Sequence, residues 1–327
     1  MRSSAAINMM PRHLRNKLVE VLYHRVYMPM RMRKHSSDDP LLSVIQQDNV
    51  IIIRKQPDSP SKPIREVILP QQHLGYARDV KQSFDFYFSA VVPEMRGNVA
   101  VADFSKPDWH RTPDFAEPIF FTGLAEPMSS VQQYIDLLSL KPGQIVIDAG
   151  AYCGLSTVVF ANIVGKTGKV IAIEPDQGSF AALMKNIARQ NVGDIVIPFE
   201  ACLWNTDGSQ FFDMEGNLGS AVNDVLIGRS GNVKRVRSIT MQTLINESGV
   251  KKVDALKIDI EGAEYTILDT IDDILAHHKP MIVMEPHKFN GKMRIDLLME
   301  KLARMGYQGE VIDQSGIAYP LIKAWPK

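Results

Sequence analysis

The chain has 327 residues, 45% of them hydrophobic and 23% charged, which are ordinary values for a soluble globular protein with a sizeable core. Lys and Arg together number 37, as do Asp and Glu, so the charge balance excludes a general electrostatic attraction to nucleic acid or membrane. With two cysteines and no apolar run of about 18 residues, the sequence predicts neither a disulfide framework nor a transmembrane helix, and a cytoplasmic location is expected.

Residues 1–40 are expected to form a basic N-terminal extension. Its first 35 residues hold eight Lys or Arg and a single acid, Glu20, which gives the segment a net charge of +7. Apolar residues between Leu14 and Leu22 have helical spacing. We favour a helix that packs on the body of the protein. Weak association of residues 1–35 with an anionic membrane surface is one alternative, and an organelle transit peptide is another.

Residues 41–125 are expected to form a β-rich region that caps a substrate site. Val50–Arg54 is a short apolar run typical of a strand. Phe84–Val92 alternates aromatic and small residues, which predicts a strand that pairs with Asn98–Asp103 through a turn at Gly97. The proline-rich stretch that follows predicts an irregular connector.

Residues 126–327 are expected to form the main domain, because strands there alternate with helices, the pattern of a parallel sheet covered on both faces. The expected strands are 144–149, 170–174, 195–201, 255–259, 281–285, 307–312 and 317–322. The expected helices are 131–140, 154–164, 177–190, 265–278 and 292–305, with an irregular segment at 205–235. Open sheets of this kind bind ligands at the carboxyl ends of their strands, so the residues after each strand are the candidates for function.

The first of these strands leads into a glycine-containing turn, in the sequence IVIDAGAYCGLST at 145–157. Gly150 permits a tight turn and close backbone approach, and a helix that begins near Gly154 offers free N–H groups and the positive end of its dipole. Glu174 ends the second strand, where a carboxylate can accept hydrogen bonds from both hydroxyls of a ribose. Capping of the next helix is the alternative role for Glu174, although Asp176 is better placed for it.

Two cofactors fit a glycine turn followed by an acid: a nicotinamide dinucleotide and S-adenosylmethionine. The dinucleotide fingerprint G-x-G-x-x-G has a G-x-G pair that is missing between Gly150 and Gly154. A dinucleotide also needs its pyrophosphate seated in the turn, whereas S-adenosylmethionine has no phosphate. The sequence therefore favours the methyl donor, and an NAD-dependent oxidoreductase is the less favoured alternative.

The fourth strand ends in a group of charged residues, in the sequence ALKIDIEGAE at 255–264. Lys257, Asp259 and Glu261 are expected on one side of the strand. Three acids within six positions repel one another unless something uses them. The dipole at a helix start explains Glu264, but no solvent-facing position explains Asp259 at the end of a buried strand.

The motifs VIDAGAYCGLST, VIAIEPD and LKIDIEGAE occur in the order found in the FkbM family of S-adenosylmethionine-dependent methyltransferases, which the chain resembles over about residues 115–312. The pattern K-x-D-x-E-G-x-E, from Lys257 to Glu264, is the most specific part. The family's first motif usually reads D-x-G-A-N-x-G, so Tyr152 is a departure from it.

The resemblance implies an α/β fold: a class I methyltransferase, Rossmann-like, doubly wound sheet of seven strands with an antiparallel last hairpin, here with an N-terminal α+β extension. It also implies methylation of oxygen on sugars or natural-product scaffolds.

The resemblance further implies a set of cofactor-binding residues at the ends of three strands: Asp148, Gly150, Ala151, Gly154, Glu174, Pro175, Glu200 and Ala201. In this set, Asp148, Gly150 and Gly154 would hold the methionine end of the cofactor and Glu174 its ribose. The third strand, which ends at Glu200 and Ala201, would contact the adenine.

Asp259, Glu261 and His287 are the candidate catalytic residues. Asp259 or His287 could take the proton of an acceptor hydroxyl, although a histidine at this place is as often a surface residue. Alternatively, these three residues and Glu285 could hold a divalent metal, and such an oxygen-rich set suits Mg²⁺ better than Zn²⁺. The metal is the less favoured interpretation, since acids can also position a substrate through hydrogen bonds.

The methyl acceptor is expected to be a small molecule, with a saccharide as one candidate, held between residues 80–125 and 205–235. Trp109 could stack on a sugar or serve in packing. Nucleic acid is not expected as a partner, because no basic aromatic strip lies outside the first 35 residues. A cofactor-binding scaffold without turnover is the competing hypothesis of another class.

Overall fold

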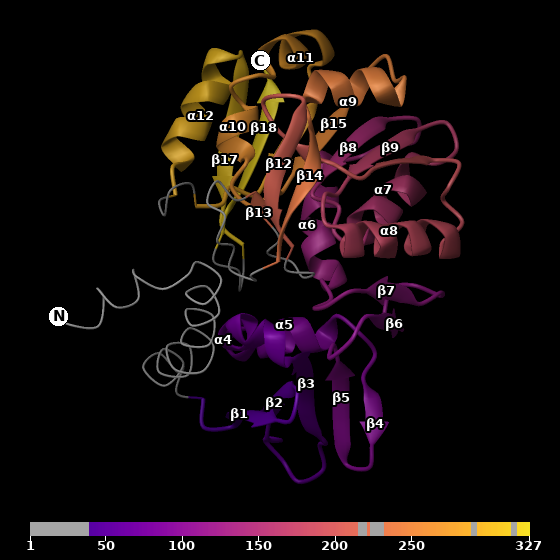
Figure 1. The fold of residues 1–327 in the computed structure, drawn as a ribbon, viewed down its shortest axis with the longest axis vertical. Helices are drawn as coiled ribbons and strands as arrows, with labels where there is room; N and C mark the ends of the chain where they lie inside the picture. Colours follow the sequence, from indigo (N-terminus) through magenta and orange to yellow (C-terminus); the bar gives the residue numbers. More distant parts are fainter. Residues whose placement is uncertain (1–38, 215–220, 223–231, 289–292, 315–318) are drawn as a thin grey trace, which may run out of the picture.

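The computed structural model describes residues 39–214, 221–222, 232–288, 293–314 and 319–327. Within them, a five-stranded N-terminal sheet lies below a main domain built on a seven-stranded sheet (Figure 1). The helix expected between Leu14 and Leu22 falls outside the described residues. Among the described residues, no helix combines the length and the apolar character that crossing a membrane requires.

The seven-stranded sheet has the order β10-β9-β8-β15-β16-β18-β17. Its strands are β8 (Ile145–Ala149), β9 (Lys169–Ile173), β10 (Val196–Phe199), β15 (Ala255–Ile258), β16 (Met281–Met284), β17 (Tyr307–Ile312) and β18 (Leu321–Pro326). Neighbours pair in parallel from β10 to β16, and β18 is antiparallel to both β16 and β17. The predicted doubly wound sheet with an antiparallel last hairpin is therefore confirmed.

Helices cover both faces of this sheet: α6 (Met128–Leu138), α7 (Leu155–Val164), α8 (Gln177–Arg189), α9 (Met241–Ser248), α10 (Glu264–Ile267), α11 (Asp272–His278) and α12 (Ile295–Arg304). Ile147 and Ile171 share a core cluster with α9, α11 and α12. Val146 and Val170 belong to another cluster, with α6, α7 and α8. Because successive side chains of a strand point to opposite faces, β8 and β9 are buried on both sides.

The N-terminal sheet has the order β1-β2-β3-β5-β4. Its strands are β1 (Leu42–Gln47), β2 (Val50–Lys55), β3 (Ile64–Pro70), β4 (Glu94–Arg96) and β5 (Val99–Asp103). Three short helices follow β3: η2 (Gln71–Tyr76), α4 (Ala77–Gln82) and α5 (Phe84–Ser89).

The strand predicted to begin at Phe84 is wrong, because Phe84–Ser89 forms helix α5. Aromatic residues alternate along this stretch, but Phe84 and Phe88 are also four positions apart, and their rings stack in the helix with centroids 5.6 Å apart. Arg65 of β3 lies over both rings. The expected turn at Gly97 is present, and it joins the antiparallel pair β4 and β5.

Two further segments differ from the sequence prediction. The stretch expected to be irregular contributes to a small sheet of β11 (Cys202–Leu203), β12 (Gly208–Asp213), β13 (Ala221–Val222) and β14 (Val233–Ile239), in the order β11-β14-β12-β13. Both β12 and β14 carry apolar residues suited to a half-buried strand, and they pair antiparallel with each other. The single helix expected over 265–278 is divided into α10 and α11.

A hairpin of β6 (Asp108–His110) and β7 (Ile119–Phe121) lies between the two sheets, within the stretch expected to be an irregular connector (Figure 1). One core cluster contains residues of the N-terminal sheet together with Leu155 and Val159 of α7. The Asn186 side chain of α8 accepts a hydrogen bond from Phe120 N (2.7 Å) and donates to Phe120 O (2.9 Å) and Cys153 O (2.7 Å). The N-terminal region is thus attached directly to the turn after β8.

Replacing Asn186 by alanine is expected to lower the free energy of unfolding by roughly 1–3 kcal/mol, because Asn186 is fully buried and the variant leaves backbone groups of Phe120 and Cys153 without their partner. Urea denaturation measures the change. The exposed Asn205→Ala is the control and should stay within about 0.5 kcal/mol of the parent. Equal stabilities of the two variants would contradict the role given to Asn186.

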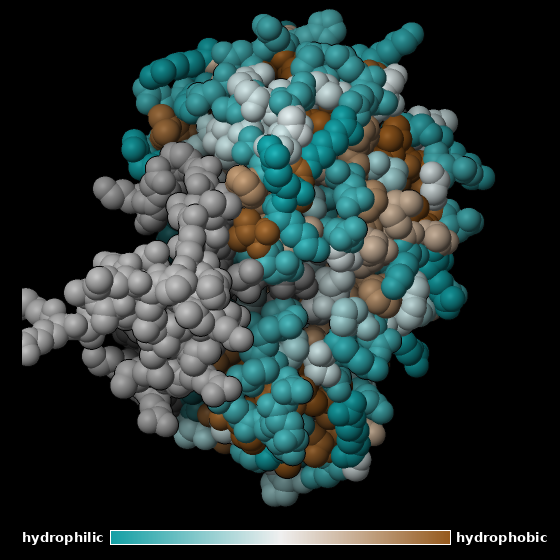
Figure 2. Space-filling model, in the orientation of Figure 1, coloured by the Kyte–Doolittle hydropathy of each residue, from teal (hydrophilic) through white to brown (hydrophobic). Residues whose placement is uncertain are grey.

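The visible surface of the described residues is largely hydrophilic, with apolar residues in small separate groups (Figure 2). The large apolar side chains that are most exposed lie on different elements: Val92, Met95, Trp109, Met184, Phe211 and Val311. Such scattered positions are normal on globular proteins, so attention goes to the pocket at the strand ends.

Candidate functional site

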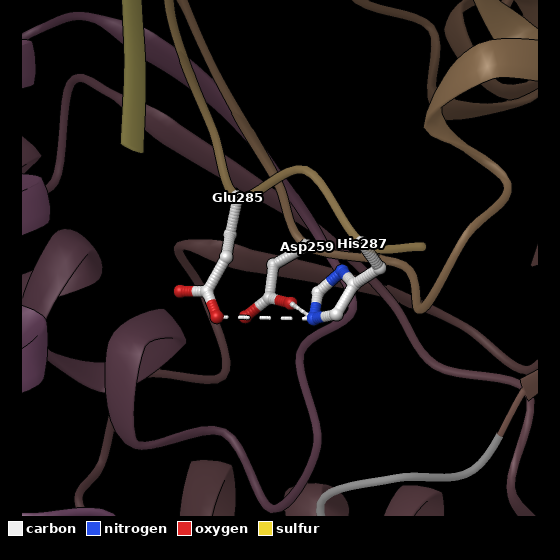
Figure 3. A group of neighbouring side chains, drawn as sticks. All are labelled: Asp259, Glu285 and His287. Atoms are coloured by element: carbon white, nitrogen blue, oxygen red, sulfur yellow. Dashed lines mark ion pairs between the residues drawn. The ribbon is translucent and has the colours of Figure 1, made fainter. Parts of the chain in front are cut away.

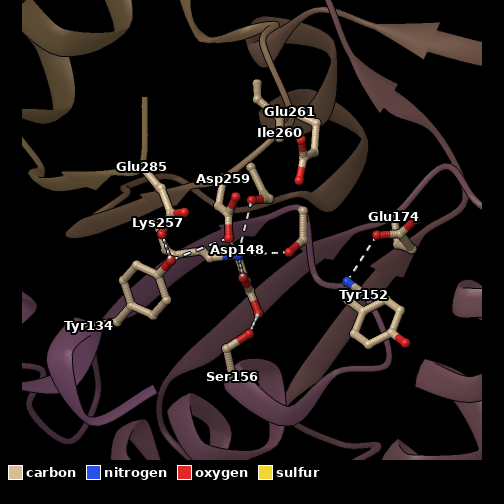
Figure 4. A network of polar contacts seen from close by, with 12 residues as sticks. Tyr134, Asp148, Tyr152, Ser156, Glu174, Lys257, Asp259, Ile260, Glu261 and Glu285 are labelled. Carbon is tan, nitrogen blue, oxygen red and sulfur yellow. Dashed lines mark hydrogen bonds and ion pairs between the residues drawn. The ribbon is translucent and has the colours of Figure 1, made fainter. Parts of the chain in front are cut away.

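A pocket that is partly open to solvent lies at the carboxyl ends of β8, β9 and β15. Its lining residues are Glu126, Gly150, Tyr152, Ile173, Glu174, Pro175, Ala201, Cys202, Leu203, Phe212, Lys257, Asp259, Ile260, Glu261 and Ala263. Figure 4 shows the polar residues around it. The pocket lies where the sheet order reverses at β8, the expected ligand position in a doubly wound sheet.

Gly150 brings two strand ends into contact at the floor of the pocket. Its φ is +80°, and a Cβ atom there would lie 1.7 Å from the backbone oxygen of Asp259. Gly154 has a φ of +86° and faces Leu183 of α8, which a Cβ would approach to 2.3 Å. Gly150 therefore permits close approach at the pocket, whereas Gly154 permits the packing of α7 on α8.

The Lys257 side chain contacts both the turn after β8 and the turn after β15. Its Nζ donates to Gly150 O at 2.7 Å and lies 3.5 Å from Asp148 Oδ1 and 3.4 Å from Asp259 Oδ2. Burial alone would lower the pKa of Lys257, but the carboxylates of Asp259 and Asp148 raise it, so the side chain stays charged.

Asp148 is fully buried, and its Oδ2 accepts hydrogen bonds from Ser156 Oγ (2.7 Å) and Thr157 Oγ1 (2.6 Å). It supports the start of α7 beneath the pocket.

Glu174 has its carboxylate at the end of β9, inside the pocket (Figure 4). Its Oε2 accepts from Tyr152 N at 2.9 Å and its Oε1 from Asp176 N at 2.8 Å. Burial raises the pKa of Glu174 to about 8. Asp176 is the N-cap of α8, with Oδ1 accepting from Gly178 N and Ser179 N, so helix capping does not require Glu174.

Tyr152, the departure from the usual family motif, holds Glu174 through its backbone N–H. Its side chain reaches the N-terminal region, where the hydroxyl donates to Leu124 O at 3.1 Å. Its φ is +49°, in the left-handed region that asparagine adopts more readily than tyrosine. The tyrosine therefore connects the turn to the N-terminal region.

A group of acids surrounds His287 beside the pocket (Figure 3). His287 Nε2 lies 3.8 Å from Asp259 Oδ1, 3.8 Å from Glu285 Oε1 and 3.7 Å from Glu261 Oε1, while Nδ1 lies 3.0 Å from Glu264 Oε1. Strand β15 ends at Ile258, and Glu261 sits in a turn with a φ of +52°, so the expectation that Lys257, Asp259 and Glu261 share one side of a strand is wrong. The turn instead brings the acids around one histidine.

This crowding of acids alters their protonation. Burial, aided by the charge of Asp259 and opposed by that of His287, raises the pKa of Glu261 and of Glu285 to about 7 each. Burial alone would lower the pKa of His287, but Glu261, Glu264 and Asp259 raise it well above its ordinary value. The shift thus favours the protonated form of the histidine, and the shifts of the two glutamates favour their neutral forms.

The residues predicted from sequence divide into two groups. Gly150, Glu174, Pro175, Ala201, Asp259 and Glu261 line the pocket, whereas Asp148, Ala151, Gly154, Glu200 and His287 are not among its lining residues. Glu200 is exposed, and Cys202, Leu203 and Phe212 form the wall near the end of β10 instead. Ala151 is buried, and its N–H donates to Ile173 O.

Three polar residues of the site were not foreseen. Glu126 lines the pocket from the segment before α6, and burial raises its pKa to about 7. Tyr134 of α6 and Gln314 after β17 contact the acids from the side. The sequence around them carries no motif, and only the fold brings them to the strand ends.

The strand order and the pocket at the reversal point define a class I methyltransferase domain. Residues 148–308 match the family model of the methyltransferase FkbM domain, which places the chain in the FkbM family of S-adenosylmethionine-dependent methyltransferases, as the sequence motifs predicted. This membership argues against the NAD-dependent alternative.

Curated relatives cover parts of the chain. Protein-L-isoaspartate O-methyltransferase 2 of Archaeoglobus fulgidus is 39% identical over 83 residues, which are 24% of this chain and 34% of that protein. The AMB antimetabolite synthetase AmbE of Pseudomonas aeruginosa is 26% identical over 210 residues, 53% of this chain and 10% of that protein. The matches thus span about a third and a tenth of the relatives' own lengths.

Among solved structures, methyltransferase FkbM from Methylobacillus flagellatus is 17% identical with a TM-score of 0.44, covering 57% of this chain and 45% of that one. The fold assignment above depends on the strand order of this chain and not on that likeness.

The family implies S-adenosylmethionine as methyl donor, and the pocket residues fit it. Gly150 lets the turns after β8 and β15 meet at the floor of the pocket, and the Glu174 carboxylate stands where a ribose is expected. Ala201, Cys202 and Leu203 offer an apolar wall for a flat ring. Acids at one end suit the positive charge of a sulfonium.

The affinity for S-adenosylhomocysteine is expected to increase as the pH rises from 6 toward 8. Only the ionised Glu174 can accept two ribose hydroxyls, and its raised pKa means that a proton must leave before binding. Below that pKa each pH unit should change the dissociation constant by about tenfold. Calorimetric titration at several pH values, with NAD as a parallel ligand, measures this change.

Glu174→Gln should bind S-adenosylhomocysteine more weakly by roughly 1.5–3 kcal/mol at pH 8. Its affinity should also depend less on pH. That result would assign the pH dependence to Glu174 and not to Glu126 or Glu261, whose pKa values are raised as well. An unchanged profile in this variant would remove Glu174 from the ribose.

Proposed function

We propose that the protein transfers a methyl group to an oxygen atom of a small molecule, with saccharide hydroxyls as the first acceptors to test. The observation that supports this is the position of the acids. Asp259 and Glu261 line the same pocket as Gly150 and Glu174. Groups that can take a proton therefore lie beside the expected position of the methyl donor.

S-adenosylmethionine, when bound, would supply a methyl group carried on a sulfonium. The acceptor oxygen would form the new C–O bond, and the sulfur would keep the electrons of the broken C–S bond. Only the proton of the hydroxyl would then remain for the chain to accept. A base accepts a proton most efficiently when its pKa is near the working pH. The pKa of Glu261, raised to about 7, meets this condition. A protonated His287 cannot accept a further proton, so we favour a carboxylate, Asp259 or Glu261, as proton acceptor. His287 would orient both carboxylates.

The lining of the pocket favours a neutral hydroxyl compound over a nucleic acid. Among the described residues, four acids, Glu126, Glu174, Asp259 and Glu261, line it together with one lysine, Lys257. A phosphate backbone would be repelled there, and binding to nucleic acid depends on Lys and Arg contacts. Polar groups that accept hydrogen bonds suit a polyol.

Of the two segments expected to hold the acceptor, 205–235 contributes Phe212 to the pocket lining, whereas no residue of 80–125 is among the lining residues. Glu126 closes it from the side of the N-terminal region, and Phe212 of β12 adds an apolar wall. Trp109 is not among the lining residues; its ring packs edge-on against Phe120, and Arg189 lies over it. We therefore do not assign Trp109 to the acceptor.

The experiment is a transfer assay with S-adenosylmethionine labelled in the methyl group and a cell extract separated into small molecules, protein and nucleic acid. Label is expected in the small-molecule fraction, on a product whose methyl group is identified as an ether or ester by NMR. Label in protein or nucleic acid alone would contradict the proposal. Tight binding of S-adenosylhomocysteine with no label in any fraction would favour the scaffold hypothesis.

A further inference from the structure

Asp259, Glu285 and His287 each have one polar atom that is held by a neighbour and one that faces the other two residues (Figure 3). His287 Nδ1 lies 3.0 Å from Glu264 Oε1, which also accepts from Ile260 N at 3.1 Å. A histidine held at Nδ1 by a carboxylate presents Nε2 in a fixed direction, the usual arrangement of a metal-binding histidine. The ring is also packed against Tyr319, with centroids 4.9 Å apart.

The two carboxylates are held in the same manner. Tyr134 Oη lies 3.3 Å from both Asp259 Oδ2 and Glu285 Oε2 (Figure 4). Lys257 Nζ is a further neighbour of Asp259 Oδ2 at 3.4 Å, and Gln314 Nε2 donates to Glu285 Oε2 at 2.9 Å. These contacts leave Asp259 Oδ1 and Glu285 Oε1 pointing toward His287 Nε2.

His287 Nε2 belongs to a side chain that is 8% exposed, yet among the described residues it makes no hydrogen bond. Its neighbours are carboxylate oxygens of Asp259, Glu261 and Glu285 at 3.7–3.8 Å, too far for a hydrogen bond. The nitrogen thus belongs to a largely buried side chain, is aimed between three carboxylates and is hydrogen-bonded to none of them, an arrangement that a cation among the four groups would complete.

We propose that Asp259 Oδ1, Glu285 Oε1 and His287 Nε2 bind a divalent metal ion, with Glu261 as a neighbouring carboxylate. One potential ligand atom from each of the three residues lies within 4.8 Å of the others. Metal–ligand bonds of about 2.0–2.3 Å therefore need only small side-chain shifts. Such an ion would lower the pKa of an acceptor hydroxyl bound to it. This catalytic role rests on the proposed function, whereas metal binding itself does not.

The donor set indicates which ion binds. Two carboxylates alone suit Mg²⁺, Ca²⁺ or Mn²⁺, whereas an imidazole suits later transition metals. Mn²⁺ accepts both kinds of ligand. Because the site includes a histidine, we expect Mn²⁺ to bind more tightly than Mg²⁺. The competing arrangement is a protonated His287 that itself serves as the cation among the acids.

The test is a titration of the full chain, freed of metal by EDTA and desalting, with Mn²⁺ followed by the EPR signal of the free ion. One saturable site per chain is expected, with competition by Mg²⁺ and Zn²⁺ ranking the ions. Glu285→Gln and His287→Gln should each weaken binding by more than the ~10–100-fold expected for Glu264→Gln, which removes an outer partner. The exposed Asp296→Asn is the matched control and should bind as the parent does.

Mn²⁺ should also raise the melting temperature of the parent and of Asp296→Asn, but not that of His287→Gln. This second readout shows whether a variant that fails to bind is still folded. No saturable site in the parent, or a site that survives both Glu285→Gln and His287→Gln, would overturn the proposal and leave the protonated histidine as the resident cation.

The metal site and the proposed function can fail separately. Mn²⁺ binding at these residues without methyl transfer to any small molecule would retain the metal site and contradict the proposed function. Transfer at full rate by EDTA-treated protein that binds no Mn²⁺ would retain the function and overturn the metal site.

Discussion

Asp259→Asn is expected to lower the turnover number by about 10²–10⁴-fold while the dissociation constant of S-adenosylhomocysteine stays within a few-fold of the parent. The amide has almost the shape of the carboxylate, so the contacts with Tyr134 and the position of the turn should survive. It can neither accept a proton at neutral pH nor supply a charged oxygen to a metal. Single-turnover kinetics with the labelled donor measure the first quantity and calorimetry the second.

Loss of one charge from this group should not unfold the protein. Lys257 keeps its hydrogen bond to Gly150 O and its ion pair with Asp148. Asp296→Asn, which removes an equal charge from the surface, is the control for net charge. Turnover of Asp259→Asn within tenfold of the parent would assign Asp259 a structural role and move the proton to Glu261 or Glu285.

The main sheet could be predicted from the sequence because its evidence is local. The parallel strands β8, β9, β15 and β16 are short apolar runs that alternate with helices, and glycines mark the turn after β8. The candidates Gly150, Glu174 and Asp259 follow such runs directly, and they line the pocket. Glu200 also follows a run, but the chain turns into β11 after it, and Cys202 and Leu203 take its place in the wall.

The remaining parts of the site depend on contacts between distant segments. Tyr134 reaches Asp259 across 125 positions of the chain and Glu285 across 151. Glu126 lies on a segment whose place is set by the packing of the N-terminal region on α7. No spacing within the sequence encodes these distances.

Helix α5 shows the same limit in secondary structure. Alternating aromatics satisfy both a strand and a helix, and the contact of Phe84 and Phe88 with Arg65 of β3 decides between them. Burial in the tertiary structure thus outweighed a local propensity.

Gly150→Ala is expected to abolish cofactor binding and to lower the melting temperature more than any other substitution considered for the pocket. The left-handed φ of +80° by itself costs an alanine about 1–2 kcal/mol. The larger effect is steric, because the new Cβ would lie 1.7 Å from Asp259 O and 2.9 Å from the carbonyl carbon. Since these atoms belong to the backbone, the turns after β8 and β15 must separate.

Gly249→Ala separates the two effects of the Gly150 substitution. Gly249 has a φ of +71° at the end of α9, and a Cβ there would meet nothing within 4 Å. This variant should lose only the conformational term and should bind S-adenosylhomocysteine as the parent does. Thermal melting and calorimetry of the two variants side by side give the comparison. If Gly150→Ala matched Gly249→Ala in both measurements, the turns could move apart at little cost. The contact between the ends of β8 and β15 would then not be what shapes the pocket.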